Sequence, residues 1–135
     1  LRGRRRVRRR RGVAHPTGVL RLHADWAWVV VAVNAVAGVW AIVAHWRPSL
    51  RSRALPVAIV AGWATVAVQV LLGVYLSAGE DLEAPEFHEF YGFVALISVA
   101  LIYSYRSQVK DFQYLLVGLG GLFLMGLALR AIYLA

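Results

Sequence analysis

The chain has 135 residues, of which 60% are hydrophobic, and it contains no cysteine. The lack of cysteine excludes disulfides, thiolate metal sites and c-type haem attachment. The net charge of +8 comes from one segment, because residues 1–12 hold eight arginines and no acid, whereas the remainder carries seven basic and seven acidic side chains.

Residues 1–18 are expected to form a basic, disordered N-terminal tail. Such arginines attract anionic lipid headgroups or nucleic-acid phosphates. The segment has no interleaved aromatic residues, and no folded module accompanies it. It also lacks the short apolar core and small-residue cleavage site of a signal peptide. We therefore expect the lipid bilayer as a partner and no nucleic acid.

Four apolar segments fill the rest of the chain, at about 24–46, 55–78, 88–105 and 112–135. Each is close to or above the roughly 20 predominantly apolar residues that cross a bilayer. Short loops between such segments place successive helices antiparallel. The sequence therefore predicts an all-α fold, an up-and-down bundle of four transmembrane helices over residues 19–135.

The first segment carries a polar stripe. His23, Asn34 and His45 are separated by eleven residues, about three helical turns, so they share one face. A polar face within lipid should point into the bundle. The stripe permits the hypothesis of a small transporter or proton path, although it has no charged residue at mid-membrane.

The loops differ in charge. Loop 47–53 has three arginines and no acid, loop 80–89 has five carboxylates and no base, and loop 106–111 contains Arg106, Lys110 and Asp111. The positive-inside rule places loops 47–53 and 106–111 in the cytoplasm and loop 80–89 outside. This predicts a multi-pass protein of the cell membrane, most simply a bacterial plasma membrane. The arginine tail would then lie outside, which contradicts the same rule. We assign the orientation from the charges of the short loops.

The outer end of the predicted bundle gathers features of a haem site. His23 and His88 open the first and third segments, and small residues, Ala27 and Gly92, follow them by four positions. A glycine or alanine one turn from a polar side chain leaves room for a flat group. Bis-histidine haem needs one imidazole from each of two helices, and Arg130 is a candidate partner for the propionates. We predict His23 and His88 as ligands of the haem iron.

The second segment contains the pattern Gln-x-x-Leu-Gly at residues 69–73. The order of these motifs resembles three successive helices in one half of the haem A synthase family, whose halves are four-helix membrane bundles with a histidine pair near the outer surface. The resemblance covers roughly residues 20–105. It implies bound haem b, with His23 and His88 as paired ligands, and we add Gln69 and Gly73 to the candidate cofactor-binding residues.

The resemblance implies haem binding more directly than catalysis. The family has two such halves and this chain has one. Leu20 stands where a carboxylate associated with catalysis is expected, and Ala24 follows the first histidine where arginine is usual. We therefore assign no catalytic residue, leave enzymatic activity open, and expect electron transfer or haem handling.

Two alternatives remain. The chain could be a non-catalytic accessory subunit of a larger membrane complex, such as a respiratory assembly or a transporter, or form a homodimer. The glycines between Gly118 and Gly126 would suit close packing against a partner helix. Alternatively, His23, His88 and Glu89 could hold a metal ion without a haem.

Overall fold

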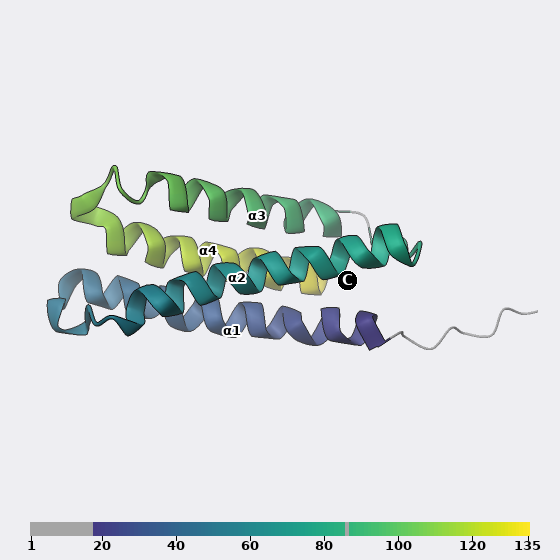
Figure 1. The fold of residues 1–135 in the computed structure, drawn as a ribbon, viewed down its shortest axis with the longest axis horizontal. Coiled ribbons are helices and arrows are strands. Elements are labelled where there is room, and N and C mark those ends of the chain that lie inside the picture. The colour runs from purple at the N-terminus through teal and green to yellow at the C-terminus, as the bar shows by residue number, and fades with distance from the viewer. Residues whose placement is uncertain (1–17, 86) are drawn as a thin grey trace, which may run out of the picture.

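The computed structural model describes residues 18–85 and 87–135, and in these residues it contains four long helices (Figure 1). They are α1 (Gly18–Trp46), α2 (Ala54–Val74), α3 (His88–Tyr105) and α4 (Gln113–Tyr133). A π-helical turn, Tyr75–Gly79, extends α2, and 3-10 turns lie at Pro48–Leu50 and Lys110–Phe112. The predicted all-α four-helix bundle is confirmed. The predicted basic tail lies outside the described residues, apart from Gly18, which begins α1.

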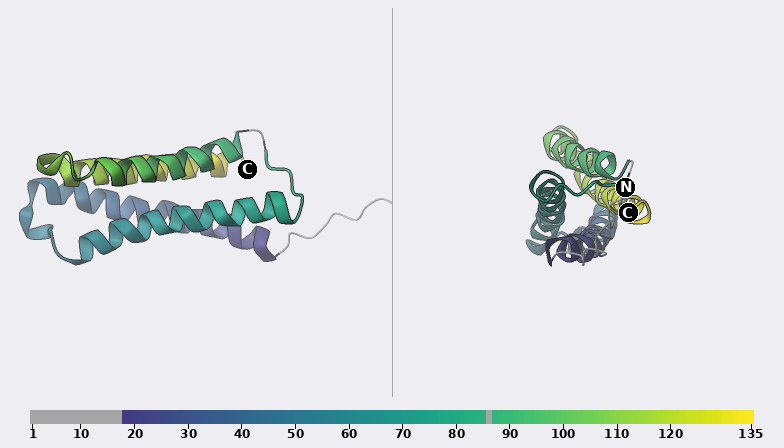
Figure 2. Two further views of the ribbon diagram at one scale, coloured as in Figure 1. Left: turned by 45° about the horizontal axis from the view of Figure 1, so that its top comes forward. Right: turned by 90° about the vertical axis from the view of Figure 1, so that its right-hand side faces the viewer.

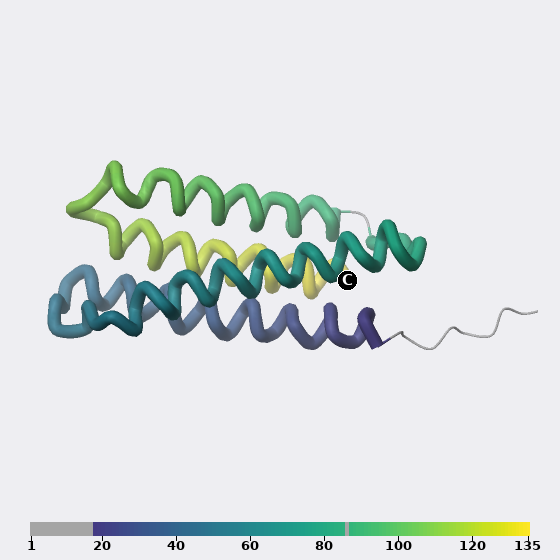
Figure 3. Tube along the Cα trace, viewed as in Figure 1, coloured from purple at the N-terminus to yellow at the C-terminus, as the bar shows by residue number. Residues whose placement is uncertain are grey.

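The helices run alternately up and down, so α1 and α3 begin at the same end of the bundle (Figures 1 and 3). We call this the acidic end, after the connection 80–87 between α2 and α3. The connections 47–53 and 106–112 lie together at the opposite end, the basic end. The bundle therefore separates the acidic loop from both basic loops by its full length.

Local sequence explains where the helices stop. Pro48 ends α1, because the residue before a proline is pushed out of the helical region, and Arg47 has φ −122° and ψ 89°. Pro56 is tolerated in the first turn of α2, where its missing N–H has no helical partner. At the acidic end, Phe87 adopts a left-handed conformation with φ 67° directly before α3.

All four helices are long and apolar enough to cross a membrane. Buried positions hold mainly small residues, including Ala27, Ala37, Ala41 and Ala44. Large apolar side chains lie outside, and Val57 and Leu71 are 69% and 68% exposed. Such a surface is unfavourable in water, whereas in a bilayer it contacts lipid while small residues let the helices approach. The fold and composition are those of a multi-pass membrane protein.

The tightest seam joins α1 and α4. A Cβ at Gly118 would lie 2.6 Å from Cγ1 of Ile42 and 2.8 Å from the carbonyl oxygen of Gly38. A Cβ at Gly121 would lie 3.1 Å from the Cα of Gly38. Gly118 and Gly121, which were candidates for packing against a partner helix, therefore pack against α1 of the same chain. Gly126, by contrast, has open space around it.

Polar groups join α1 to α2. The Asn34 side chain, 2% exposed, donates from Nδ2 to the carbonyl oxygen of Gly62 on α2 at 3.2 Å and also to that of Val30 within α1 at 2.8 Å. Nearer the acidic end, the Trp26 indole N–H donates to the carbonyl oxygen of Thr65 at 2.9 Å. Hydrogen bonds of this kind between helices contribute about 0.6–2 kcal/mol each in a membrane. They make α1 and α2 a firmly connected hairpin.

The four helices surround a common axis (Figure 2, right). α1 packs most extensively against α4, and α3 rests mainly on α4, while α2 and α3 form the sparsest interface between neighbours. At the acidic end, Ser77 beyond α2 donates a hydrogen bond to Oε1 of Glu89 on α3 at 2.9 Å. The bundle is therefore held least firmly between α2 and α3.

Candidate functional site

The two histidines predicted from the sequence meet at the acidic end of the bundle, where both are half-buried. His23 lies near the start of α1, and His88 is the first residue of α3. Their ring centroids are 5.9 Å apart, with an angle of 72° between the ring planes. They are 65 positions apart in the sequence, so the tertiary fold brings them together.

His88 has a defined orientation. Its Nδ1 lies 3.0 Å from the carbonyl oxygen of Ala131 on α4. A carbonyl can only accept, so this contact requires hydrogen on Nδ1 of the neutral ring and leaves a lone pair on Nε2. The Ala131 carbonyl is free for this bond because it belongs to the last turn of α4, and the amide of Ala135 donates to Ile132 instead.

His23 is held differently. Its Nδ1 is buried and has no hydrogen-bond partner among the described residues. Gln69 on α2 donates from Nε2 to the backbone carbonyl of His23 at 2.9 Å, while its own Oε1 is also buried and unpartnered. Gly73 lies beside the ring, where a Cβ would be 3.3 Å from Cε1 of His23. Gln69 therefore secures the backbone of His23 through its side chain, and its own backbone is a hydrogen-bond partner of the His23 imidazole.

A cavity of about 60 Å³ lies beside His88, and His23 does not line it. Its polar lining comes from Gln69, His88 and Tyr91, and its remaining walls are aliphatic groups and Gly92. A Cβ at Gly92 would meet no atom within 4 Å, so this glycine leaves open space four residues after His88. The structure therefore gathers His23, Gln69, Gly73, His88 and Gly92 in one place.

Arg130 is not part of this cavity wall. It is exposed on α4 and does not line the space, although the next residue, Ala131, does. Sequence reasoning missed two contributors. Tyr91 could have been found, since it lies three residues after His88 and hence on the same helical face. The carbonyl of Ala131 has no signal in the sequence, because every residue carries one.

Glu89 does not complete a three-ligand metal centre. Among the described residues, no three His, Cys, Asp or Glu side chains are grouped closely enough to hold a metal ion. Glu89 instead accepts the hydrogen bond from Ser77. The donor set at this end is thus the pair of imidazoles.

His45 occupies the opposite end of α1. Its ring stacks on Phe112 with centroids 6.0 Å apart, and its Nδ1 is buried without a hydrogen-bond partner in the described part of the chain. Nearby, Arg51 donates to the carbonyls of Ala44 and His45 at 2.8 and 2.9 Å and so caps the end of α1. No second described histidine lies at this end.

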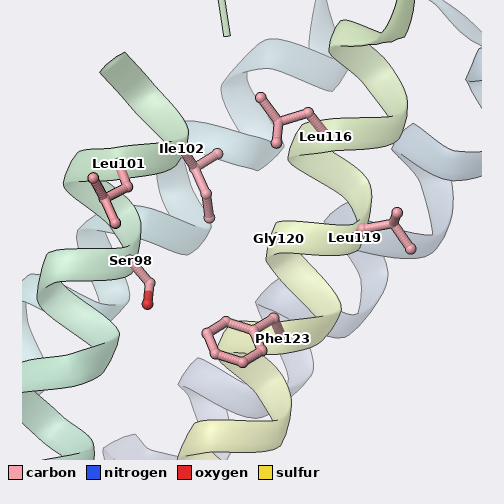
Figure 4. Close-up of a pocket in the computed structure, with 7 residues that line it drawn as sticks. All are labelled: Ser98, Leu101, Ile102, Leu116, Leu119, Gly120 and Phe123. Atoms are coloured by element: carbon pink, nitrogen blue, oxygen red, sulfur yellow. The ribbon is translucent and has the colours of Figure 1, made fainter. Parts of the chain in front are cut away.

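A larger groove of about 360 Å³ lies between α3 and α4, away from the histidines (Figure 4). Its lining is apolar apart from Ser98, whose hydroxyl donates to the carbonyl of Val94 at 2.6 Å. A shallow apolar groove on the outside of a membrane bundle suits lipid chains, and it presents no group for catalysis or metal binding.

No protein-family model, curated protein sequence or solved structure matches this chain. The candidate site therefore rests on its own geometry.

Proposed function

We propose that this chain is an integral membrane b-type haem protein whose iron is ligated by His23 and His88. The observation that carries the proposal is the separation of 5.9 Å between the two imidazole centroids at the acidic end of the bundle. Two imidazoles on opposite sides of one metal ion hold their ring centres about 6 Å apart, because a metal–imidazole bond is about 2 Å long and the bonding nitrogen lies about 1 Å from the ring centre.

The chemistry of the surroundings favours haem over a bare metal ion. A bare transition-metal ion commonly takes four protein or solvent ligands, and the described part of the chain brings two imidazoles together here. A haem needs just two axial ligands from the protein, since its macrocycle supplies the other four. His88 offers Nε2 as a ligand atom, since its Nδ1 bonds Ala131. Once bound, the cofactor would supply one-electron redox chemistry.

The space at the site sets a condition on binding. The cavity measures about 60 Å³, whereas pockets for cofactors usually enclose roughly 300 Å³ or more. The macrocycle therefore needs the acidic ends of α2 and α3 to separate. This is the sparsest neighbouring interface in the bundle, and Gly92 already leaves open space on α3.

The charge of the loops supports an orientation for the site. We infer that loops 47–53 and 106–111 face the cytoplasm and that loop 80–89 faces outward, as the positive-inside rule favours. α3 has 18 residues and is about 27 Å long, close to the roughly 30 Å of the hydrocarbon core. His88, its first residue, then lies near the outer boundary of the bilayer.

The orientation is tested by cysteine labelling, since the chain has no cysteine of its own. Glu83→Cys is expected to react with an impermeant thiol reagent in intact cells. Ser52→Cys and Ser107→Cys are expected to react only after the cells are opened. All three positions are exposed, so access to the reagent depends on the side of the membrane. The reverse pattern would overturn the assignment of sides.

The proposed function is tested by the visible spectrum of the protein purified from haem-sufficient cells. We expect a Soret band, sharp low-spin bands after dithionite reduction and one haem per chain. The double variant His23→Ala/His88→Ala should lose them, while His45→Ala, which changes a histidine at the other end of α1, should keep them. A wild-type protein without a Soret band would contradict the proposal and favour the accessory-subunit hypothesis.

A further inference from the structure

The groove of about 360 Å³ between α3 and α4 has a definite place along the bundle. Its walls come from residues 98–102 of α3 and residues 116–123 of α4 (Figure 4). The longer of these stretches covers about 10 Å of a helix axis. Both belong to the halves of α3 and α4 that are nearest the basic end. The groove therefore lies within one leaflet of the membrane, close to the boundary with water at the basic end.

The walls of the groove are apolar. Leu101, Leu119 and Phe123 are large exposed side chains that line it. Its one polar side chain is Ser98, whose hydroxyl already donates to the carbonyl of Val94 at 2.6 Å. An occupant therefore contacts this groove through hydrocarbon.

The groove does not suit a partner helix. It covers about a third of the roughly 30 Å that a helix must cross, and helices approach closely where small residues leave the backbone bare. Gly120 lies at the groove but is already covered, because a Cβ there would lie 2.5 Å from Cδ1 of Ile102. Gly118 and Gly121 pack against α1. A flexible acyl chain fits such a short groove, whereas a straight helix does not.

Two cations lie beyond the groove at the basic end. Arg106 follows Ile102 by one helical turn, and its backbone amide donates to the carbonyl of Ile102 at 3.1 Å. Its guanidinium lies 3.9 Å from the centre of the Tyr103 ring and donates from Nη1 to the Tyr103 carbonyl, which uses one of its five N–H donors. Lys110 is exposed in the connection between α3 and α4. Among the described residues, no carboxylate forms an ion pair with either cation.

We propose that the groove between α3 and α4 binds one anionic phospholipid, with an acyl chain along the groove and the phosphate held by Arg106 and Lys110. A guanidinium matches the geometry of a phosphate, and an ammonium adds a point charge. In the proposed orientation the basic end lies in the cytoplasmic leaflet, whose anionic lipids attract such cations. The groove lies away from His23 and His88, so the inference does not depend on haem binding.

The first test is native mass spectrometry of the full chain in detergent. Phosphatidylglycerol, which is anionic, is compared with phosphatidylcholine, which is zwitterionic and carries the same acyl chains. We expect one phosphatidylglycerol to stay bound per chain. Each cation strengthens binding to an anionic lipid by up to about five-fold, so two cations give a preference of up to about 25-fold.

Charge variants test the headgroup contact. Arg106→Gln/Lys110→Gln is expected to lose most of the preference for phosphatidylglycerol. Arg47→Gln/Arg53→Gln is the matched control, because it removes the same charge from the other connection at the basic end. The control should keep the preference of the wild type.

A filled groove tests the acyl-chain contact. Ser98→Phe places a ring in the groove and is expected to weaken the binding of both lipids. Ser104→Phe is the matched control, because the Ser104 hydroxyl makes the same kind of bond, to the Ala100 carbonyl at 2.7 Å, but Ser104 does not line the groove. Circular dichroism and gel filtration establish which variants remain folded, and the comparison of lipids on the wild type needs no variant.

Three results would overturn the inference. Equal binding of the two lipids by the wild type would remove the headgroup contact. Equal loss of preference in both charge variants would assign the attraction to the basic end as a whole. Unchanged phosphatidylglycerol binding by folded Ser98→Phe would exclude the groove, and a wild-type dimer that Ser98→Phe dissociates would assign the groove to a second copy of the chain. Each result is obtained whether or not the protein binds haem.

Discussion

Under the proposed haem function, leucine in place of Gly92 is expected to prevent most haem binding while leaving the bundle folded. A Cβ at this position meets no atom within 4 Å, so the added side chain enters the open space beside His88 without displacing backbone. It would then occupy room that the macrocycle needs. Overpacking of about 1–3 kcal/mol corresponds to binding weaker by about five-fold to more than a hundred-fold. Haem content per chain and a titration of the haem-free protein measure this effect.

Gly126→Leu is the matched control for this experiment. Gly126 also has open space around it, but it does not line the cavity beside His88. Its replacement should leave both haem content and thermal stability close to the wild type. Full haem occupancy in Gly92→Leu would show that the cofactor does not use the space beside His88.

Leucine in place of Gly118 is expected to destabilise the bundle itself. Its Cβ would lie 2.8 Å from both the carbonyl oxygen of Gly38 and the backbone nitrogen of Ile42. Backbone atoms cannot turn aside as a side chain can, so α1 and α4 must separate along their most extensive interface. We expect a loss of about 3 kcal/mol, at the upper end of the usual range for overpacking.

Thermal unfolding in detergent, followed by circular dichroism, measures this loss. Gly126→Leu again serves as control, because it makes the same substitution on the same helix without a contact. A Gly118→Leu variant as stable as the wild type would mean that α1 and α4 do not pack through this seam in the membrane. The two variants should therefore differ in what they change. Gly92→Leu should lower the cofactor content, and Gly118→Leu should lower the stability.

Much of the architecture was predictable from local sequence. Four apolar segments, separated by loops with Pro48 at one turn and carboxylates at another, determine the number of helices and their alternating direction. Direction alone then predicts that His23 and His88, which both open odd-numbered helices, lie at the same end. Hydropathy and turn residues determine local structure over only a few positions. Their effect can therefore be predicted from one sequence, without knowledge of the tertiary contacts.

Which helices are neighbours, and which face each turns inward, was decided by the tertiary structure. Gly118 looked suitable for an external partner, yet it packs against α1 of the same chain. Arg130, the candidate partner for the propionates, lies exposed beside Ala131, and the carbonyl of Ala131 is the group that orients His88. Apolar side chains gain little by moving from lipid to a helix interface. Helix rotation therefore depends on close packing and on hydrogen bonds between residues distant in sequence, and neither can be read from the pattern of one segment.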